Sequence, residues 1–169
     1  PLDDRGHPIL AYSACLTEQG VIFGGRNRIY RYDYDSRSIK LLLDFSSDPY
    51  FAISAISRWD EETLLCCSRW QGLRLINLRS GERRLPPFDC GKEIMALLID
   101  SHNRIWLAPY NEGLRCFNPE GRLLASYTTD NSGLSNNVVL SMAERDSHIW
   151  VGTDGGGINI IHPDSHRIT

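Results

Sequence analysis

Short runs of apolar residues, separated by polar turns, follow one another along the whole chain. Four of these runs are alike, and each is followed by a second run in which polar and apolar positions alternate. Alternation with a period of two is typical of half-buried β-strands, whereas an amphipathic helix needs a period of 3.6 residues, which no stretch sustains. The pattern therefore predicts an all-β protein built from short strands.

The predicted strands recur at a fixed spacing. The first set of runs begins at Val21, Leu64, Ile105 and Ile149, so that the successive offsets are 43, 41 and 44 residues. The runs that follow them begin at Ile29, Leu73, Leu114 and Ile158, with offsets of 44, 41 and 44 residues. Several short strands per unit of 40 to 45 residues are typical of β-propeller blades.

Each unit contains a first strand of small and apolar residues, a second and a third strand joined by a Gly-containing loop, and a fourth strand after a turn rich in Asp, Asn, Ser and Gly. We therefore expect a partial β-propeller of about four blades, each of four antiparallel strands, over residues 9–51, 52–92, 93–137 and 138–169. The sequence stops about where the last fourth strand should start, so we expect the last blade to be incomplete. A β-sandwich also has short strands but would not repeat in this way.

Two tryptophans, Trp106 and Trp150, occupy the same position in successive units, with Phe23 and Leu65 as their expected counterparts. A single four-stranded sheet cannot bury both of its faces, and stacking blades face to face solves this problem. We therefore expect both tryptophans to pack between neighbouring blades rather than to stack on a sugar.

The stretch from Asn131 to Thr169 contains Gly-Leu-Ser-Asn-Asn, a strand, a polar turn, Ile-Trp-Val-Gly-Thr, Gly-Gly-Ile and then Pro-Asp. This order resembles the two-component-regulator propeller repeat. The match is strongest in the last unit, good in the third, and weaker in the first two, where Gly-Thr becomes Gly24-Gly25 and Cys67-Ser68. The resemblance implies the periplasmic propeller region of a hybrid two-component sensor histidine kinase of the kind typical of gut Bacteroidetes.

In that family an immunoglobulin-like domain, a membrane helix, a histidine kinase and often a fused receiver follow the propellers. The resemblance thus implies part of an extracytoplasmic sensor region, periplasmic as the ectodomain of an inner-membrane protein, which senses glycan-derived ligands and relays a signal across the membrane. The implied partners are an oligosaccharide or another small molecule, the remaining blades of the parent chain, and a second copy of the parent in a homodimer. The membrane is then reached only through the parent's transmembrane helix.

In propellers of this family, the loops between second and third strands lie on one face together with the blade-to-blade connections. The predicted ligand-binding residues in these loops are Arg26, Asn27, Arg69, Trp70, Tyr110, Asn111, Glu112 and Asp154. Arginine, aromatic and amide side chains hydrogen-bond to and stack on oligosaccharides. The alternative for each residue is an ordinary solvated turn position.

Two other functions stay open. The first is a stand-alone, lectin-like carbohydrate-binding propeller that closes by self-association. The second is a fragment of a propeller glycan lyase or hydrolase, which needs an acid–base pair from Glu112, Asp154 and Asp48, with Tyr110 as a proton donor.

Composition and charge exclude several classes of function. The formal net charge is -3, and no basic stripe alternates with aromatic residues, so we expect no nucleic-acid binding. Lys40 and Lys92 are the only lysines among 18 basic residues; the arginines have guanidinium groups that suit carboxylates, sulfates and phosphates.

The residues that usually signal catalysis or metal binding are not arranged for either. The five cysteines contain no Cys-x-x-Cys pair, and their number argues weakly against a strongly oxidising compartment. There is no Gly-x-Ser-x-Gly elbow, phosphoacceptor histidine motif or nucleotide-binding glycine box. We therefore expect this piece to have no catalytic residue, cofactor or metal.

Overall fold

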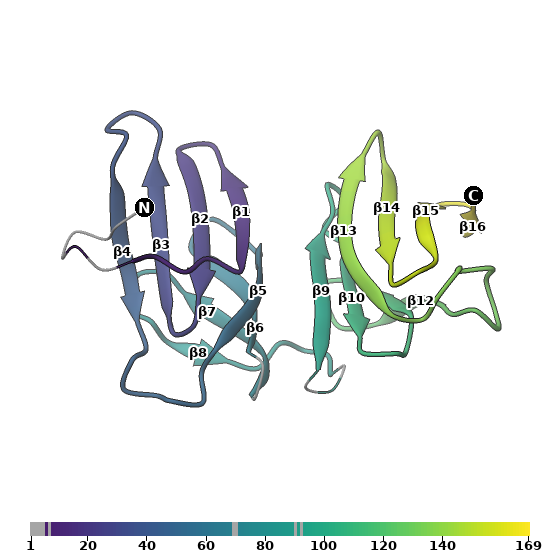
Figure 1. Ribbon diagram of the computed structural model, residues 1–169, viewed down its shortest axis with the longest axis horizontal. Helices are drawn as coiled ribbons and strands as arrows, with labels where there is room; N and C mark the ends of the chain where they lie inside the picture. Colours follow the sequence, from purple (N-terminus) through teal and green to yellow (C-terminus); the bar gives the residue numbers. More distant parts are fainter. Residues whose placement is uncertain (1–5, 7, 69–70, 90, 92) are drawn as a thin grey trace. The chain divides into compact units, whose positions relative to one another are not determined.

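The computed structural model describes residues 6, 8–68, 71–89, 91 and 93–169 of the chain. Every regular element in these residues is a β-strand, and the strands form four four-stranded antiparallel sheets. The chain divides into two compact units, residues 1–86 and 87–169, each of which contains two of the sheets (Figure 1). The sheets are the blades of a β-propeller, which confirms the fold class predicted from the repeat.

Unit 1 contains blades 1 and 2, in which each strand pairs with the next along the chain. Blade 1 consists of β1 (Ser13–Thr17), β2 (Gly20–Gly25), β3 (Arg28–Asp33) and β4 (Ile39–Asp44). Blade 2 consists of β5 (Ile53–Arg58), β6 (Thr63–Ser68), β7 (Gly72–Asn77) and β8 (Arg83–Arg84).

Unit 2 contains blades 3 and 4, with the same order of pairing. Blade 3 consists of β9 (Ile94–Ile99), β10 (Ile105–Pro109), β11 (Leu114–Phe117) and β12 (Leu123–Tyr127). Blade 4 consists of β13 (Val139–Arg145), β14 (His148–Thr153), β15 (Gly157–His162) and β16 (Arg167–Ile168).

The prediction that the last blade is incomplete is wrong in one respect, because blade 4 has a fourth strand. Arg167 and Ile168 of β16 pair with His162 and Ile161 of β15. The strand has two residues, but so does β8 of blade 2, which lies in the middle of the chain. Blade 4 therefore has the same number of strands as the other three blades.

The turns between third and fourth strands are fixed by an Asp or Asn side chain in three of the four blades. Asp33 accepts a hydrogen bond from the backbone N–H of Ser36, at 2.9 Å. Asn77 accepts two from the residues that follow it, and Asn118 accepts one from Arg122, at 2.7 Å. Such side chains satisfy the backbone of a tight turn, which explains why the repeat places Asp or Asn there.

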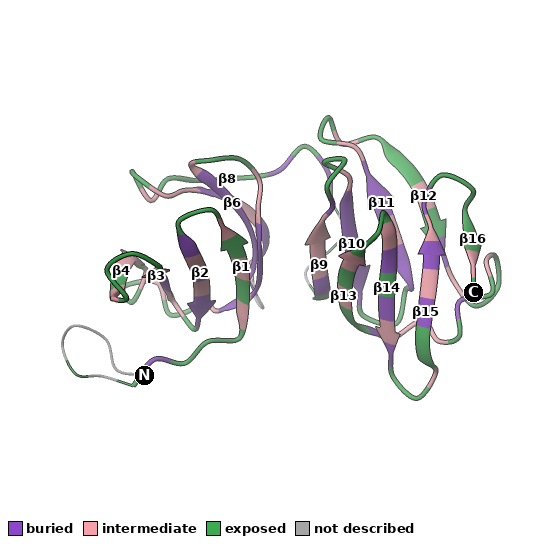
Figure 2. Cartoon of the chain, turned by 90° about the horizontal axis from the view of Figure 1, so that it is seen from above, coloured by how far each residue is buried: buried purple, intermediate pink, exposed green. Residues whose placement is uncertain are grey.

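The core of each unit lies in the space between the facing sheets of its two blades, here called the inter-blade seam. In unit 1 the buried cluster includes Ile22 and Ile29 from blade 1 and Leu64, Cys66 and Ile76 from blade 2. Figure 2 shows how burial changes along the strands, with β6 buried throughout and β14 partly buried. Successive residues of one strand face opposite sides of a sheet, so only one face of each blade contributes side chains to a given seam.

The seam of unit 2 is built around Trp106, whose side chain is 1% exposed. It packs in a cluster with Cys116 and Tyr127 of blade 3 and Ile149 and Val151 of blade 4. Its ring stacks on that of Tyr127, with 5.9 Å between the centroids. The prediction that this tryptophan packs between blades is confirmed.

Polar groups at the edge of this seam are paired. The buried carboxylate of Asp100 accepts hydrogen bonds from Trp106 Nε1–H at 2.9 Å and from Arg104 Nε–H at 2.6 Å. The Nη1 of Arg104 lies 3.2 Å from a carboxylate oxygen of Asp164, in the last turn of blade 4. These contacts tie blade 3 to blade 4.

Two expectations about the tryptophan positions are wrong. Trp150 is 39% exposed, because no other blade of its unit covers its side of blade 4. In blade 1, the counterpart of Trp106 is Ile22 and not Phe23. Ile22 lies opposite Arg31 in the strand register, as Trp106 lies opposite Cys116, and it faces the seam. Phe23 is the adjacent residue and therefore faces the other side.

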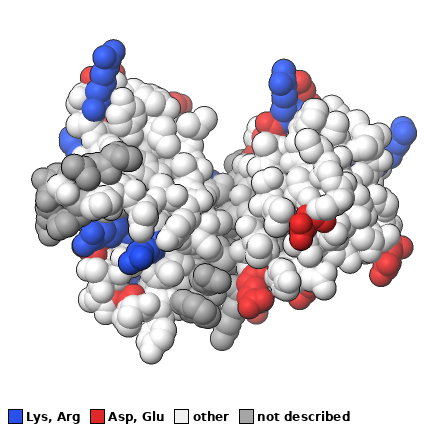
Figure 3. Space-filling model, viewed as in Figure 1, with Lys and Arg blue, Asp and Glu red and all other residues white. Residues whose placement is uncertain are grey.

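The surface shown in Figure 3 is mostly uncharged, and charged side chains stand at intervals on it. Within the described part of the chain, no helix is long and apolar enough to span a membrane. Among the same residues, no cluster of three or more His, Cys, Asp or Glu side chains is placed to hold a metal ion.

Candidate functional site

The predicted ligand-binding residues of blade 1 lie in the turn between β2 and β3. Arg26 has a positive φ of 49°, and its carbonyl accepts a hydrogen bond from the N–H of Ile53 at 2.5 Å. The carbonyl of Asn27 accepts one from the N–H of Phe45 at 2.7 Å. The turn is thus hydrogen-bonded to both ends of the connection that leads from blade 1 to blade 2. The side chain of Arg26 is exposed.

That connection, residues 45–52, is fixed by Asp48. Its carboxylate accepts hydrogen bonds from Arg83 Nη1–H at 2.8 Å and from Gln71 Nε2–H at 3.1 and 3.2 Å. The Arg83 bond, followed by that of Gln71, holds the pKa of Asp48 below its usual value. The guanidinium of Arg83 also lies over the ring of Phe51, 4.8 Å from its centroid. Asp48 is therefore a fixed carboxylate that orders the loop.

Arg69 and Trp70, the predicted ligand contacts of blade 2, lie outside the described residues. Tyr50, in the connection between blades 1 and 2, is exposed, and its backbone N–H donates to Asp48 at 3.1 Å. Sequence reasoning placed the blade-to-blade connections on the face of these loops but did not identify Arg83, which holds this one. Arg83 was hidden because it comes from the short fourth strand, far from the loop in sequence.

In unit 2, the predicted residues Tyr110, Asn111 and Glu112 form the turn between β10 and β11. Asn111 has a positive φ of 58°, a conformation that asparagine tolerates better than most residues. The carboxylate of Glu112 forms an ion pair with Arg115 Nη2 at 2.5 Å. The ring of Tyr110 is 54% exposed, so the turn presents an aromatic surface beside an amide and an ion pair.

The loop of Asp154, between β14 and β15, lies against the same connection as this turn. The N–H of Asp154 donates to the carbonyl of Val138 at 2.9 Å, and its carbonyl accepts from Asn136 Nδ2–H at 2.7 Å. The N–H of Gly113 donates to the carbonyl of Asn137, also at 2.9 Å. The structure therefore brings the two predicted loops of unit 2 to either side of residues 136–138. We call Tyr110, Asn111, Glu112 and Asp154 the unit 2 loop surface.

A polar network that includes the buried residues Asn159 and Thr153 stabilises this connection. Asn159 Oδ1 accepts the N–H of Ser135 at 3.0 Å, and Asn159 Nδ2 donates to Ser135 Oγ at 2.7 Å. The Oγ of Ser135 lies 3.0 Å from Oγ1 of Thr153. A Cβ on Gly156 would lie 2.5 Å from that same Ser135 Oγ, so only glycine fits there. Sequence reasoning missed Asn159, because its partner Ser135 lies 24 residues earlier in the chain and no local pattern links the two.

The sequence was then compared with known families and proteins. Residues 133–155 match the family model described as the two component regulator propeller. They run from the Gly-Leu-Ser-Asn-Asn segment to the loop after β14 and so contain Ser135 and Thr153 of the network above. No curated protein sequence matches the chain.

Solved structures with the same fold include natural and designed proteins. The extracellular domain assigned to the hybrid two-component system BT4673 of B. thetaiotaomicron matches with a TM-score of 0.73 and 19% identity, over 99% of this chain and 22% of that chain. The one assigned to BT3049 of the same organism matches with a TM-score of 0.65 and 12% identity, over 94% and 24%. The computationally designed protein Ika4 matches with a TM-score of 0.61 and 14% identity, over 92% of both chains.

At these identities, the structural likeness shows the fold. This chain spans about a fifth of the length of the BT4673 domain. The fold is thus that of propeller blades, and the last of them carries a two-component regulator propeller repeat.

Proposed function

We propose that this chain is part of the periplasmic sensor region of a hybrid two-component system and that it binds a glycan-derived ligand on its loops. The observation that carries the proposal is the two-component regulator propeller repeat at residues 133–155. The likeness of almost the whole chain to the extracellular domain assigned to BT4673 supports it.

The unit 2 loop surface provides the chemistry for such a ligand. The exposed ring of Tyr110 offers a flat apolar face on which a pyranose ring can stack, and Asn111, Glu112 and Asp154 offer hydrogen-bonding groups for hydroxyls. In unit 1, Arg26 and Asn27, together with Arg69 and Trp70, are the proposed contacts. The hydrogen bonds that hold the backbone of the Arg26–Asn27 turn and of the unit 2 loop surface reduce the entropy lost on binding.

Further blades of a parent chain are the proposed neighbours of blade 4. Trp150 and Ile158 share one face of this blade and are 39% and 69% exposed. Trp106, at the same position in blade 3, is buried by the next blade. An additional blade would bury this face of blade 4 in the same way.

Direct binding by the chain tests the proposal. A panel of oligosaccharides is titrated into the chain by calorimetry, with Tyr110→Ala as the variant and Tyr34→Ala as the matched control. Tyr34 is 46% exposed and lies in the turn between β3 and β4, at the opposite end of blade 1 from the β2–β3 turn. We expect one or more oligosaccharides to bind and Tyr110→Ala to weaken binding by about tenfold, the loss of one aromatic contact.

Equal affinity of the wild type and Tyr110→Ala, or no binding across the panel, would contradict a ligand site on the unit 2 loop surface. Release of reducing ends from a polysaccharide would favour the lyase or hydrolase alternative. The contacts favour binding, because Arg115 pairs with Glu112 and Arg83 with Asp48, so two of the three carboxylates from which an acid–base pair could be drawn are already in ion pairs.

A further inference from the structure

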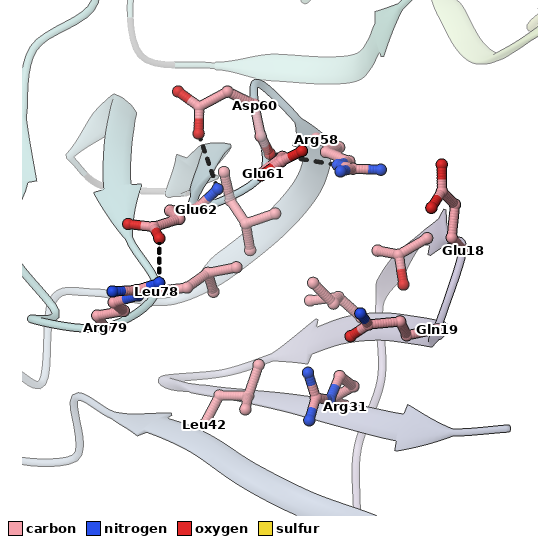
Figure 4. Close-up of a pocket in the computed structure, with 13 residues that line it drawn as sticks. Glu18, Gln19, Arg31, Leu42, Arg58, Asp60, Glu61, Glu62, Leu78 and Arg79 are labelled. Atoms are coloured by element: carbon pink, nitrogen blue, oxygen red, sulfur yellow. Dashed lines mark hydrogen bonds and ion pairs between the residues drawn. The ribbon is translucent and has the colours of Figure 1, made fainter. Parts of the chain in front are cut away.

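A cavity lies in the seam of unit 1, away from the β2–β3 turn of this unit. It has a volume of about 410 Å³ and opens between the β1–β2 turn of blade 1 and the β5–β6 and β7–β8 turns of blade 2 (Figure 4). Its apolar lining consists of Ile22, Leu42, Leu64 and Leu78. Volumes of this size accommodate small organic molecules. The β2–β3 turn, with Arg26 and Asn27, is at the other end of the strands.

The cavity contains a charged side chain where the other unit has an apolar one. Arg31 lies opposite Ile22 in the strand register, and the equivalent pair in unit 2 is Cys116 and Trp106. Both Ile22 and Cys116 are buried in their seams. Unit 2 has the larger tryptophan at this position, and the cavity beside it, of about 270 Å³, is smaller than the 410 Å³ cavity beside the isoleucine of unit 1.

The guanidinium of Arg31 is incompletely paired. Its Nε is buried and has no hydrogen-bond acceptor among the described residues. Its Nη2 is 4.0 Å from Asp33, the limit of an ion pair, and Oδ1 of Asp33 already accepts both the N–H and the hydroxyl of Ser36. A buried donor without a partner costs free energy, which an added acceptor recovers.

A second arginine borders the cavity from the facing blade. Arg58 Nε–H donates to the carbonyl of Asp60 at 3.3 Å, at the edge of the lining. Figure 4 shows Arg31 on blade 1 and Arg58 on blade 2, with the guanidinium of Arg31 in the space between the blades. Guanidinium groups bind carboxylates through two parallel hydrogen bonds.

Acidic residues at the opening restrict the charge of a ligand. Glu62 is paired with Arg79 at 2.5 Å, while Glu18, Asp60 and Glu61 are exposed. The carboxylate of Glu18 is directed away from Arg31 (Figure 4). Their negative charges repel an approaching anion, and the repulsion grows with the charge of that anion. The apolar lining and the two arginines therefore suit a ligand with one negative charge and an apolar body.

We propose that this cavity binds a small organic monocarboxylate, with Arg31 holding the carboxylate and Ile22, Leu42, Leu64 and Leu78 contacting the apolar body. Arg58 adds positive charge from the other blade. The proposal concerns a site separate from the loops and does not rest on the function proposed above.

The Nε–H resonance of Arg31 in a ¹H–¹⁵N NMR spectrum provides a direct test. The probes are 4-methylpentanoate, its uncharged amide 4-methylpentanamide, and sulfate, each titrated into the full chain. We expect 4-methylpentanoate to shift the Arg31 signal to lower field and to bind at least about tenfold more tightly than the amide or sulfate, because an ion pair is formed only with the carboxylate. Arg31→Gln should weaken its binding by a similar factor, and Arg37→Gln, at an exposed position in the same blade, should not.

A second variant keeps the test informative if Arg31→Gln does not fold. Ile22→Trp places in unit 1 the side chain that fills the seam of unit 2, and it should abolish binding while Arg31 remains. Equal binding of carboxylate and amide, tighter binding of sulfate, unchanged binding by either variant, or no shift of the Arg31 signal would overturn the proposal.

Discussion

The seams of the two units occupy the same place in the repeat but are filled differently. In unit 2 this position is the buried Trp106, whose indole N–H donates a hydrogen bond to the buried carboxylate of Asp100. In unit 1 the same position is Ile22, and Arg31 stands where unit 2 has Cys116. The cavity beside Arg31 measures about 410 Å³, against about 270 Å³ for the equivalent cavity beside Trp106.

The difference shows how one repeat can support both a packed core and an open cavity. Burial of a large aromatic side chain stabilises the folded state, whereas a charged group that leaves water needs a partner of opposite charge. Unit 2 meets both requirements within the chain, since Asp100 pairs with Arg104. Unit 1 leaves Nε of Arg31 without an acceptor among the described residues, and the proposed carboxylate ligand would supply one.

The largest effect on stability is expected when Trp106 is replaced, and Trp150 provides the comparison. Trp106→Ala removes a fully buried side chain, and we expect it to lower the free energy of unfolding by about 3–5 kcal/mol. Trp150→Ala, at the same repeat position but 39% exposed, should lower it by less than about 1 kcal/mol. Urea denaturation followed by circular dichroism measures both. Similar losses of unfolding free energy for the two variants would contradict the expectation that burial in the seam makes Trp106 the more important of the two tryptophans.

An intermediate, pH-dependent effect is expected at Asp100. Burial alone would raise the pKa of its carboxyl, but hydrogen bonds from Trp106 and Arg104 outweigh burial and hold the pKa below its ordinary value. The carboxylate therefore stabilises the fold above the pKa of an unfolded aspartate, about 3.9, and this contribution is lost as the pH falls through the lower folded pKa.

The variant that tests this effect is Asp100→Asn. We expect it to lower the free energy of unfolding by about 1–3 kcal/mol at neutral pH, because two charged hydrogen bonds are lost. The difference from the wild type should shrink as the pH falls below about 4, where the unfolded aspartate takes up a proton, and it should vanish below the lower folded pKa of Asp100. Urea denaturation at a series of pH values measures it. A difference that stays constant with pH would show that the amide disturbs packing instead.

The smallest effect is expected in the seam of unit 1. Arg31→Leu replaces a partly buried, incompletely paired charge by an apolar side chain in an apolar seam, so we expect no loss of stability or a gain of up to about 1 kcal/mol. The Arg31 side chain is 32% exposed, which keeps the gain small. Thermal and urea denaturation without added ligand measure it. A clear loss of stability would indicate that Arg31 has a structural partner in the free protein.

The repeat determined most of the fold. Three local features were enough to predict blades of four antiparallel strands. They are the strand spacing near 43 residues, the small residues in first strands, and Asp or Asn in the turn between third and fourth strands. The loop positions of Tyr110, Asn111, Glu112 and Asp154 also followed from the repeat. The roles of these residues in ligand binding remain predictions.

The tertiary structure decided what lies opposite each repeat position. The spacing made Trp106 and Trp150 equivalent, yet one is buried and the other is partly exposed, because a second blade covers only the first within its unit. The strand register, which depends on pairs distant in sequence, showed that Ile22 and Arg31 face the seam of unit 1. Burial and pairing are properties of three-dimensional neighbours, and no linear pattern records them.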